Sequence, residues 1–297
     1  MISLIIPTCN RPEDLRRCLE AIHPQLPDDG SVEVIVGDDG RHAAGRAVTE
    51  ETMPSARWIK GPSRGPASNR NAGARHASGE WLIFLDDDCV PSPQYLAAYI
   101  KAIRSADGTA VLEGSTTRLP KPPSLLWEAP ETTTAHDYLT CSANFAIRAD
   151  VFASVSGFDE RYEGGVYAED VDLSARLSRA GHRVQFVPQA AVMHPLRHVP
   201  DAEKLARRWE GKVIFAFDQG ASAFTVGWRL PWHTLRVIQS RFRGQPWNAE
   251  NVSAAWLFFH EWLLVLGKTP GWVRKWAPAP RSTFWSVHPG AVPKHGF

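Results

Sequence analysis

Residues 81–88 have the sequence Trp-Leu-Ile-Phe-Leu-Asp-Asp-Asp, in which an apolar run ends in three consecutive carboxylates. The apolar part is typical of a buried strand. Two earlier apolar runs, at residues 3–6 and 33–36, also end in polar clusters, at residues 7–11 and 38–40. In an open α/β sheet, ligands bind beyond the carboxyl ends of the strands, so we expect the chemistry of this protein at these three strand ends.

Short β-branched runs alternate with helical stretches over the first two-thirds of the chain. This alternation predicts the α/β fold class, with a mainly parallel sheet flanked by helices. We expect strands at residues 3–6, 33–36, 57–60, 81–85, 110–113, 144–147, 184–187 and 191–193. We expect helices over residues 13–22, 68–77, 149–155 and 169–179, and one more that opens at Pro93.

The α/β pattern stops near Pro195, and the sequence then favours helices. These are expected near residues 202–218, 232–242 and 252–266. Nine of the twelve tryptophans lie beyond residue 200, and the end of the chain after residue 268 is rich in Pro and Trp. We therefore expect a sheet domain over residues 1–195 and a helical, Trp-rich C-terminal extension over residues 196–297.

The charge and cysteine content exclude several classes of protein. The chain has 297 residues with 33 Lys and Arg against 32 Asp and Glu, which provides no broad face for nucleic acid. The four cysteines form no CxxC pair, as is typical of a reducing cytosol. The N-terminal apolar run is too short for a signal peptide, and His260 and Glu261 interrupt the apolar stretch 252–267. We expect a cytoplasmic protein without a transmembrane helix.

The carboxylates at residues 86–88 would repel one another unless a cation lay between them. Asp86 and Asp88 can face the same side of an extended segment. Oxygen ligands favour Mg²⁺ or Mn²⁺, which are commonly held by one or two carboxylates together with the oxygens of a substrate phosphate. The alternative is a solvated acidic turn at the end of a strand.

Three other polar positions have both a structural and a functional interpretation. Asp38-Asp39-Gly40 is a turn signal, but it stands at a strand end. Acidic residues at the start of helix 169–179 interact favourably with the N-terminal end of the helix dipole. Asp170 shares a helix face with Leu173 and Leu177, so packing of the two leucines against the core would direct its carboxylate towards the sheet end. There it could accept a proton from a hydroxyl group. His194 is a metal ligand, a general base or a structural histidine.

Taken in order, these clusters resemble a family 2 glycosyltransferase with the GT-A fold. The resemblance is carried by residues 3–11, 34–40, 70–88 and 157–181, and it covers about residues 1–195. It implies a mixed, mainly parallel nucleotide-binding sheet, with a nucleotide-sugar half at about 1–115 and an acceptor half at about 116–195. The glycine motifs of Rossmann dehydrogenases, P-loop proteins and α/β-hydrolases are missing from the sequence.

The resemblance also implies roles for individual residues. Asp170 matches the catalytic base of the family, and Glu169 is its neighbour in the same motif. Asp86 and Asp88 resemble the DxD pair that binds Mn²⁺ or Mg²⁺ together with the donor diphosphate, and His194 resembles an additional metal ligand. The residues implied to bind the donor nucleotide are Pro7, Thr8, Asn10, Arg11, Asp39, Arg70, Asn71, Asp86 and Asp87. At Cys9 the family usually has an aromatic residue, and at Gly40-Arg41 it usually has Gly-Ser.

The implied reaction is an inverting, single-displacement transfer from a nucleoside-diphosphate sugar to a hydroxyl acceptor. A UDP-sugar is the first expectation, and dTDP- and GDP-sugars stay open. The acceptor is a small molecule, a carrier-bound intermediate, a lipid-linked molecule or a glycan, and its contacts are expected from residues 116–140 and the helical extension. The aromatic side chains of the extension pack a core by default. An acceptor pocket, a homodimer contact and a peripheral membrane contact are the alternatives.

Two rival functions keep the same fold. One is a catalytically silent protein that binds a sugar nucleotide, and the other is a membrane-associated sugar transferase for polyprenyl phosphate, anchored through the Trp-rich extension. A sugar-phosphate nucleotidyltransferase is disfavoured, because residues 7–11 do not form a Gly-rich basic loop after the first strand.

Overall fold

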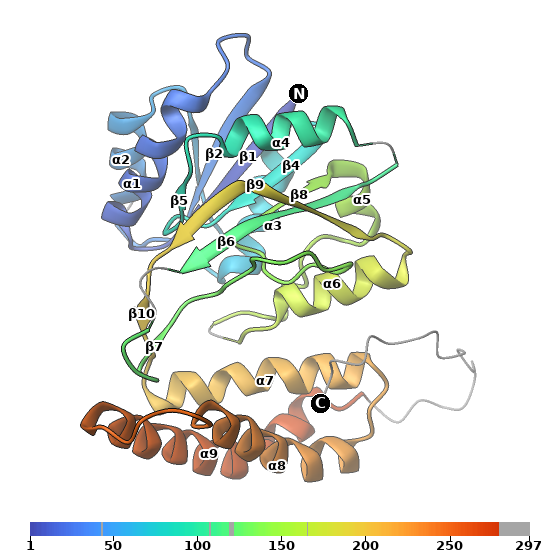
Figure 1. Cartoon of the computed structure of the whole chain (residues 1–297). Coiled ribbons are helices and arrows are strands. Elements are labelled where there is room, and N and C mark those ends of the chain that lie inside the picture. The colour runs from blue at the N-terminus through green and yellow to red at the C-terminus, as the bar shows by residue number, and fades with distance from the viewer. Residues whose placement is uncertain (43, 107, 119–121, 165, 279–297) are drawn as a thin grey trace, which may run out of the picture. The chain divides into compact units, whose positions relative to one another are not determined.

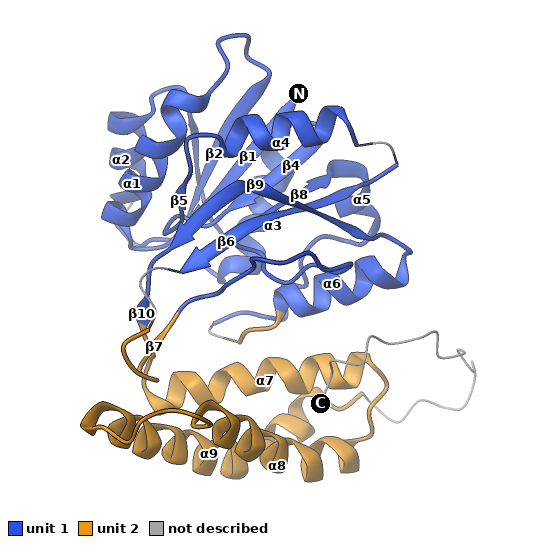
Figure 2. Cartoon of the chain, viewed as in Figure 1, with its two compact units in different colours: residues 1–121, 129–164, 169–197 blue, residues 122–128, 165–168, 198–297 orange. Residues whose placement is uncertain are grey.

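A computed structural model describes residues 1–42, 44–106, 108–118, 122–164 and 166–278. Most of the Pro/Trp-rich end expected after residue 268 lies outside the described residues. The chain divides into two compact units (Figure 2). Unit 1 comprises residues 1–121, 129–164 and 169–197, and unit 2 comprises residues 122–128, 165–168 and 198–297.

Unit 1 contains an eight-stranded sheet in the order β3-β2-β1-β4-β8-β6-β9-β5 (Figure 1). Strands β8 and β5 run opposite to the others, so the sheet is mixed and mainly parallel. The bounds are β1 (Ile2–Thr8), β2 (Val32–Asp38), β3 (Arg57–Lys60), β4 (Trp81–Leu85), β5 (Val90–Pro91), β6 (Val111–Arg118), β8 (Asn144–Arg148) and β9 (Val184–His194).

Helices cover both faces of this sheet. Successive side chains of a strand point to opposite faces, and β1 has apolar side chains on both. In β1, Leu4 and Ile6 belong to the core cluster that includes side chains of α1, α2 and α4. Ile5 belongs to the cluster that includes side chains of α3, α5 and α6. The bounds are α1 (Pro12–Ile22), which the short 3₁₀ helix η1 (His23–Gln25) follows, α2 (Ala44–Thr52), α3 (Pro66–His76), α4 (Tyr95–Arg104), α5 (Ala149–Ser154) and α6 (Glu169–Arg179).

β9 is one continuous strand where the sequence predicts two. Its register with β6 shifts between Gly114 and Thr116, and Pro188, which has no N–H to donate, lies in the shifted part. Asn144 joins the strands there: its amide donates to backbone oxygens of β6 and β9 at 3.0 and 2.9 Å, and its own oxygen accepts from the Tyr99 hydroxyl at 2.8 Å. One buried side chain therefore satisfies a backbone carbonyl group of each strand at the irregularity.

Unit 2 contains the helices α7 (Ala202–Asp218), α8 (Ala223–Arg241) and α9 (Ala249–Trp276). Each begins after a side-chain cap, because Asp201, Ser222 and Asn248 each accept a hydrogen bond from the backbone N–H three residues further on. Apolar side chains of all three helices share a core. Two short strands, β7 (Trp127–Glu128) and β10 (Arg197–His198), pair separately from the large sheet.

The helices α8 and α9 are longer than the sequence predicts. α8 begins at Ala223 rather than at residue 232, and α9 continues to Trp276. Both contain an interior proline, Pro231 and Pro270, which removes one backbone donor but does not end the helix. Pro231 is buried, and its carbonyl oxygen accepts a hydrogen bond from the Trp262 indole at 3.0 Å. Among the described residues, no helix is long and apolar enough to cross a bilayer.

Candidate active site

The carboxyl ends of β1, β2 and β4 lie at one edge of the sheet. The parallel register pairs Thr8 at the end of β1 with Asp38 at the end of β2, and it pairs Ile5 with Phe84 of β4. The chain after β4 therefore runs beside the end of β1. There the Thr8 hydroxyl donates to Asp87 Oδ2 at 2.6 Å. The polar clusters that the sequence places at separate strand ends meet at this edge.

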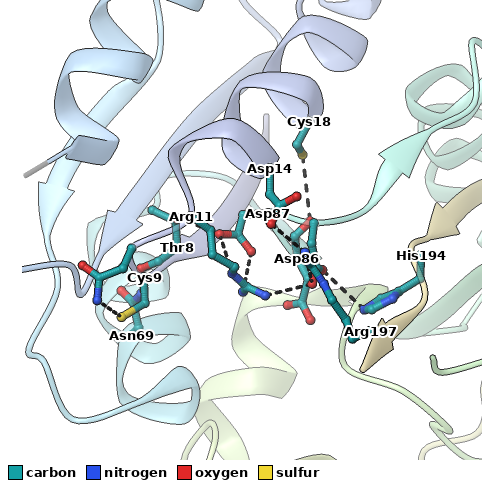
Figure 3. Close-up of polar contacts among 12 residues, drawn as sticks. Thr8, Cys9, Arg11, Asp14, Cys18, Asn69, Asp86, Asp87, His194 and Arg197 are labelled. Carbon is teal, nitrogen blue, oxygen red and sulfur yellow. Dashed lines mark hydrogen bonds and ion pairs between the residues drawn. The ribbon is translucent and has the colours of Figure 1, made fainter. Parts of the chain in front are cut away.

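Asp87 is the buried support of the acidic triplet and points back towards β1 (Figure 3). Besides the Thr8 hydrogen bond, its Oδ1 lies 2.5 Å from Nη2 of Arg11. Burial raises the pKa of Asp87 to about 7, against the opposing effects of the Arg11 charge and the Thr8 hydrogen bond. Asp87 therefore fixes Arg11 at the site and connects the triplet to β1.

Asp86 and Asp88 have separate cationic partners. Asp86 Oδ1 accepts a hydrogen bond from Arg70 Nη2 at 2.6 Å. Asp88 Oδ2 accepts from Arg11 at 2.8 Å and from Arg197 at 3.2 Å, and the same Arg197 nitrogen lies 2.6 Å from Asp14 Oδ2. The acidic triplet is thus surrounded by three arginines that come from three different parts of unit 1. Guanidinium groups are well suited to bind phosphate oxygens, so these arginines are candidates to contact a phosphate-containing ligand.

The second oxygen of Asp88 has the properties of a metal ligand. Asp88 Oδ1 is buried, accepts no hydrogen bond from any described residue, and lies 3.4 Å from His194 Nε2. His194 Nδ1 lies 2.8 Å from the Pro195 carbonyl oxygen, which only an Nδ1–H can satisfy. With the proton on Nδ1, a ring that carries a single proton presents the Nε2 lone pair towards Asp88. A cation between these two atoms would satisfy both, so the pair fits the metal that the sequence predicts.

Cys89 adds a sulfur atom to this group. Its Sγ and ligand atoms of Asp88 and His194 all lie within 4.8 Å of one another, and all three residues are buried. Burial raises the pKa of the Cys89 thiol well above its ordinary value. Cys89 could not be selected from the sequence, because an isolated cysteine next to three aspartates has no recognisable ligand spacing.

The first part of the expected nucleotide pocket consists of loops held by Asp39 and Asn10. The Asp39 carboxylate accepts hydrogen bonds from the backbone N–H groups of Ser63 and Gly65 at 2.8 and 3.1 Å. Asn10 has φ 54°, and its side-chain oxygen accepts from the Arg41 N–H at 3.3 Å. These bonds order the chain beyond β1 and β2. Pro7 is buried within β1, and Cys9 next to Asn10 is exposed.

Arg70 and Asn71 are neighbours on α3, but their side chains have different partners. Arg70 joins Asp86 to Glu169, at 2.6 and 3.4 Å, and its guanidinium lies 5.4 Å from the centre of the Phe158 ring. The Asn71 amide bonds the backbone N–H and C=O of Phe158, at 2.9 and 2.8 Å. The structure therefore brings Arg70 to the acidic triplet, and it uses Asn71 to hold the turn before α6.

Asp170 lies in the first turn of α6, where the helix dipole favours a negative charge. Leu173 and Leu177 of the same helix are buried in the core, as the shared face predicts. The pKa of Asp170 is raised, chiefly because burial disfavours the carboxylate and also because Asp86 is negative. The Val171 N–H, which donates to Asp170 at 2.8 Å, and the charge of Arg70 act in the opposite direction. A carboxylate with raised proton affinity is suited to accept a proton.

Glu113 is a buried carboxylate that no sequence motif marks. One of its oxygens accepts three hydrogen bonds, from Thr140 N, Thr140 Oγ1 and Cys141 N, at 3.0, 2.6 and 2.9 Å. Two residues further on, the Ala143 carbonyl oxygen accepts from the Asp86 N–H at 3.0 Å. Burial raises the pKa of Glu113 to about 7, the three hydrogen bonds lower it, and the Asp170 charge adds to the rise. Glu113 thus holds the chain segment that supports Asp86.

The fold is that of known nucleotide-sugar transferases. A mannosyltransferase from Pyrobaculum calidifontis, solved with GDP-Man and Mn²⁺, has a TM-score of 0.57 at 16% identity, over 91% of this chain and 86% of that one. S. aureus TarS 1–349, solved with UDP-GlcNAc, has a TM-score of 0.60 at 16% identity, over 92% and 81% of the two chains. The protein therefore has the GT-A fold that the sequence predicts, with additional C-terminal helices.

Family models identify the chain more closely. The model for glycosyl transferase family 2 matches residues 3–149, and that for glycosyl transferase family group 2 matches residues 81–268. The chain belongs to the family 2 glycosyltransferases and is a transferase enzyme. It is 26% identical over 220 residues to the glycosyltransferase AglE of Haloferax volcanii, covering 70% of each chain. It is 28% identical over 264 residues to a pre-mycofactocin glycosyltransferase of Mycobacterium tuberculosis. That alignment covers 80% of this chain but 50% of the relative.

Proposed function

We propose that this glycosyltransferase transfers a sugar from a nucleoside-diphosphate sugar to a hydroxyl acceptor, with inversion, in a reaction that requires Mn²⁺ or Mg²⁺. The observation that carries the proposal is the group of three carboxylates Asp86, Asp88 and Asp170 at one edge of the sheet, with Asp88 Oδ1 directed at His194. These groups match the needs of the reaction: a leaving diphosphate gains negative charge, and an acceptor hydroxyl loses a proton.

The donor half of the site is assigned to the ends of β1, β2 and β4. Pro7, Thr8, Asn10 and Asp39 would surround the nucleoside, and Arg11, held by Asp87, would face the diphosphate. Asp88 and His194, with Asp86, would hold the metal. When bound, the metal supplies positive charge that stabilises the departing diphosphate by several kcal/mol.

Asp170 is assigned as the base. In a single displacement, the acceptor oxygen forms a bond to the anomeric carbon while the bond from that carbon to the diphosphate oxygen breaks, and the hydroxyl proton passes to Asp170. The raised pKa of Asp170 increases its affinity for that proton. Arg70 and Glu169 position this end of α6 relative to Asp86, because Arg70 pairs with both carboxylates.

A UDP-sugar is the first candidate donor. Solved structures with the same fold hold UDP-GlcNAc in one case and GDP-Man in another, which supports a nucleoside-diphosphate sugar without selecting the base. The acceptor is assigned only as a hydroxyl-bearing molecule: a small molecule, a carrier-bound intermediate, a lipid-linked molecule or a glycan.

The test is calorimetric binding of UDP, dTDP, GDP and CMP, each with and without Mn²⁺. We expect one diphosphate to bind tightly to the wild type only with metal, and to lose that binding in Asp88→Ala. Asp28→Ala, which changes an exposed carboxylate in the loop before β2, is the matched control and should bind as the wild type does. Binding of no nucleotide, or binding that ignores both the metal and Asp88, would contradict the proposed donor site.

A further inference from the structure

Helix α9 is apolar on two faces, and only one of them is buried in the core of unit 2. Buried residues such as Ala254, Phe258 and Val265 form the inner face. The outer face carries a regular stripe with alternating spacings of four and three residues. Its members are Val252, Trp256, Phe259, Leu263 and Leu266, with exposed fractions between 44% and 70%. A soluble helix normally presents polar side chains at such positions.

Helix α8 carries a second stripe, in which residues four apart lie on one face. Phe224, Trp228 and Trp232 are 83%, 64% and 51% exposed. The two stripes border each other, because Trp262 of α9 donates to the carbonyl oxygen of Pro231, next to Trp232, and its ring lies 6.0 Å from that of Phe259. We call the two stripes together the aromatic face.

The charges around the aromatic face are mainly positive. Residues 223–275 contain seven Lys and Arg but two Asp and Glu. Three of the seven basic side chains pair with acids: Arg241 with Glu261, Lys268 with Glu203 and Lys275 with Glu210. One of the two acids, Glu261, is buried, where it accepts a hydrogen bond from the Trp209 indole at 2.7 Å. Arg229 and Arg236 are exposed on α8, and Arg243 is exposed in the loop that follows it. Exposed aromatic side chains are thus combined with a local excess of positive charge, although the whole chain has a net charge of +1.

We propose that the aromatic face docks on the surface of a membrane that contains anionic lipids. Tryptophan is favoured at the boundary of headgroups and acyl chains, where its ring is apolar and its N–H stays hydrated. Arginines beside it attract anionic headgroups. The stripe on α9 spans 14 residue steps, about 21 Å at 1.5 Å per residue, which suits a helix lying along the surface. A second copy of the chain would bring the same positive charges together, so lipid is the better electrostatic match.

The test is co-sedimentation of the full chain with vesicles of phosphatidylcholine, alone or with phosphatidylglycerol. We expect binding to the anionic vesicles that weakens as salt is added, because exposed charges are screened. Trp228→Ser combined with Trp256→Ser should weaken that binding about a hundredfold, and Arg229→Glu combined with Arg236→Glu should remove the preference for anionic vesicles. Trp127→Ser, at an exposed tryptophan of β7 outside the aromatic face, is the matched control and should bind as the wild type does.

A measurement on the wild type alone guards against a variant that fails to fold. Lipids brominated on their acyl chains should quench part of the tryptophan fluorescence when the anionic vesicles bind. The proposal is overturned if the wild type binds no vesicle, if the brominated lipids quench nothing, or if the Trp228/Trp256 variant binds unchanged. Light scattering is the remaining check. If the wild type is a dimer and the Trp228/Trp256 variant is a monomer, a second copy of the chain occupies the aromatic face, and the proposal is overturned. None of these readouts depends on glycosyl transfer, so the result is independent of the proposed function.

Discussion

Replacement of Glu113 by Gln should remove a defined part of the pH dependence of stability. Glu113 is 2% exposed, and burial raises its pKa from an ordinary 4.5 to about 7. At pH values between these two pKa values, the folded state binds more protons at this position than the unfolded state does. The free energy of unfolding therefore falls as pH rises. For one group with these two pKa values, the fall between pH 5 and pH 8 is about 2.5 kcal/mol. A glutamine cannot titrate, and its amide oxygen can still accept from Thr140 and Cys141.

The assay is urea unfolding of both proteins at pH 5 and at pH 8. Other titrating groups contribute nearly equally to both proteins, so the difference between the two free energies of unfolding isolates Glu113. Between pH 5 and pH 8, the free energy of unfolding of Glu113→Gln should rise by about 2.5 kcal/mol relative to that of the wild type. Glu20→Gln, on the exposed face of α1, is the matched control. A difference that stays constant within about 0.5 kcal/mol, or that moves in favour of the wild type, would refute the reasoning.

Three further outcomes are expected. Asp170→Asn should lower kcat by about 10²–10⁴-fold and leave calorimetric donor binding unchanged, and near-full turnover would show that Asp170 is not the base. Gly211→Ala should lower the free energy of unfolding by about 3 kcal/mol or more, because a Cβ would lie 1.6 Å from a backbone oxygen. Gly267→Ala should raise it by about 0.5–1 kcal/mol, because a Cβ there would meet no described atom within 4 Å beyond its own stretch of helix. Equal melting temperatures for these two variants would contradict that account. Trp209→Phe should cost about 1.5–3 kcal/mol in urea unfolding, because it removes the N–H that Glu261 accepts at 2.7 Å, and an unchanged midpoint would contradict the importance of this bond.

Much of unit 1 could be predicted from local sequence signals. The strands at 57–60 and 81–85 and the helix at 169–179 have the predicted bounds, and that helix is followed by Gly181 at φ 84°. Helix α2 gave no such signal, since it contains Gly45, a poor helix former. A Cβ at Gly45 would lie 2.7 Å from Asp38 Oδ2, so the glycine is required by a contact that only the folded chain creates.

Interior prolines account for the errors in unit 2. The sequence predicted a helix start at residue 232, directly after Pro231, but the helix starts nine residues earlier, at Ala223. The missed signal was Ser222, whose hydroxyl caps the helix by accepting from the Thr225 N–H at 3.1 Å. Packing against α9 then holds Pro231 inside the helix. A proline is therefore an ambiguous boundary unless the residues before it are searched for a cap.

Most of the candidate residues came from polar clusters or from the family resemblance, whereas residues outside both were missed. The acidic triplet marks its own strand end, but the sequence does not show that Asp87 points at Thr8 while Asp88 faces His194. Those directions depend on the parallel register of β1 and β4. Arg197 and Glu113 stand in no motif, and their relation to the site follows from strand pairing across long stretches of chain.

The pairing of Arg197 with Asp14 has a consequence for how the protein folds. The two residues are 183 positions apart, Arg70 and Glu169 are 99 apart, and Thr8 and Asp87 are 79 apart. Contacts of such separation form only after long loops have closed, which makes them slow and late in folding. During synthesis, the acidic triplet exists well before Arg197 leaves the ribosome. The electrostatic balance of the site is therefore completed by the last residues of unit 1, and a chain that ends before them would retain the carboxylates without one of their three arginines.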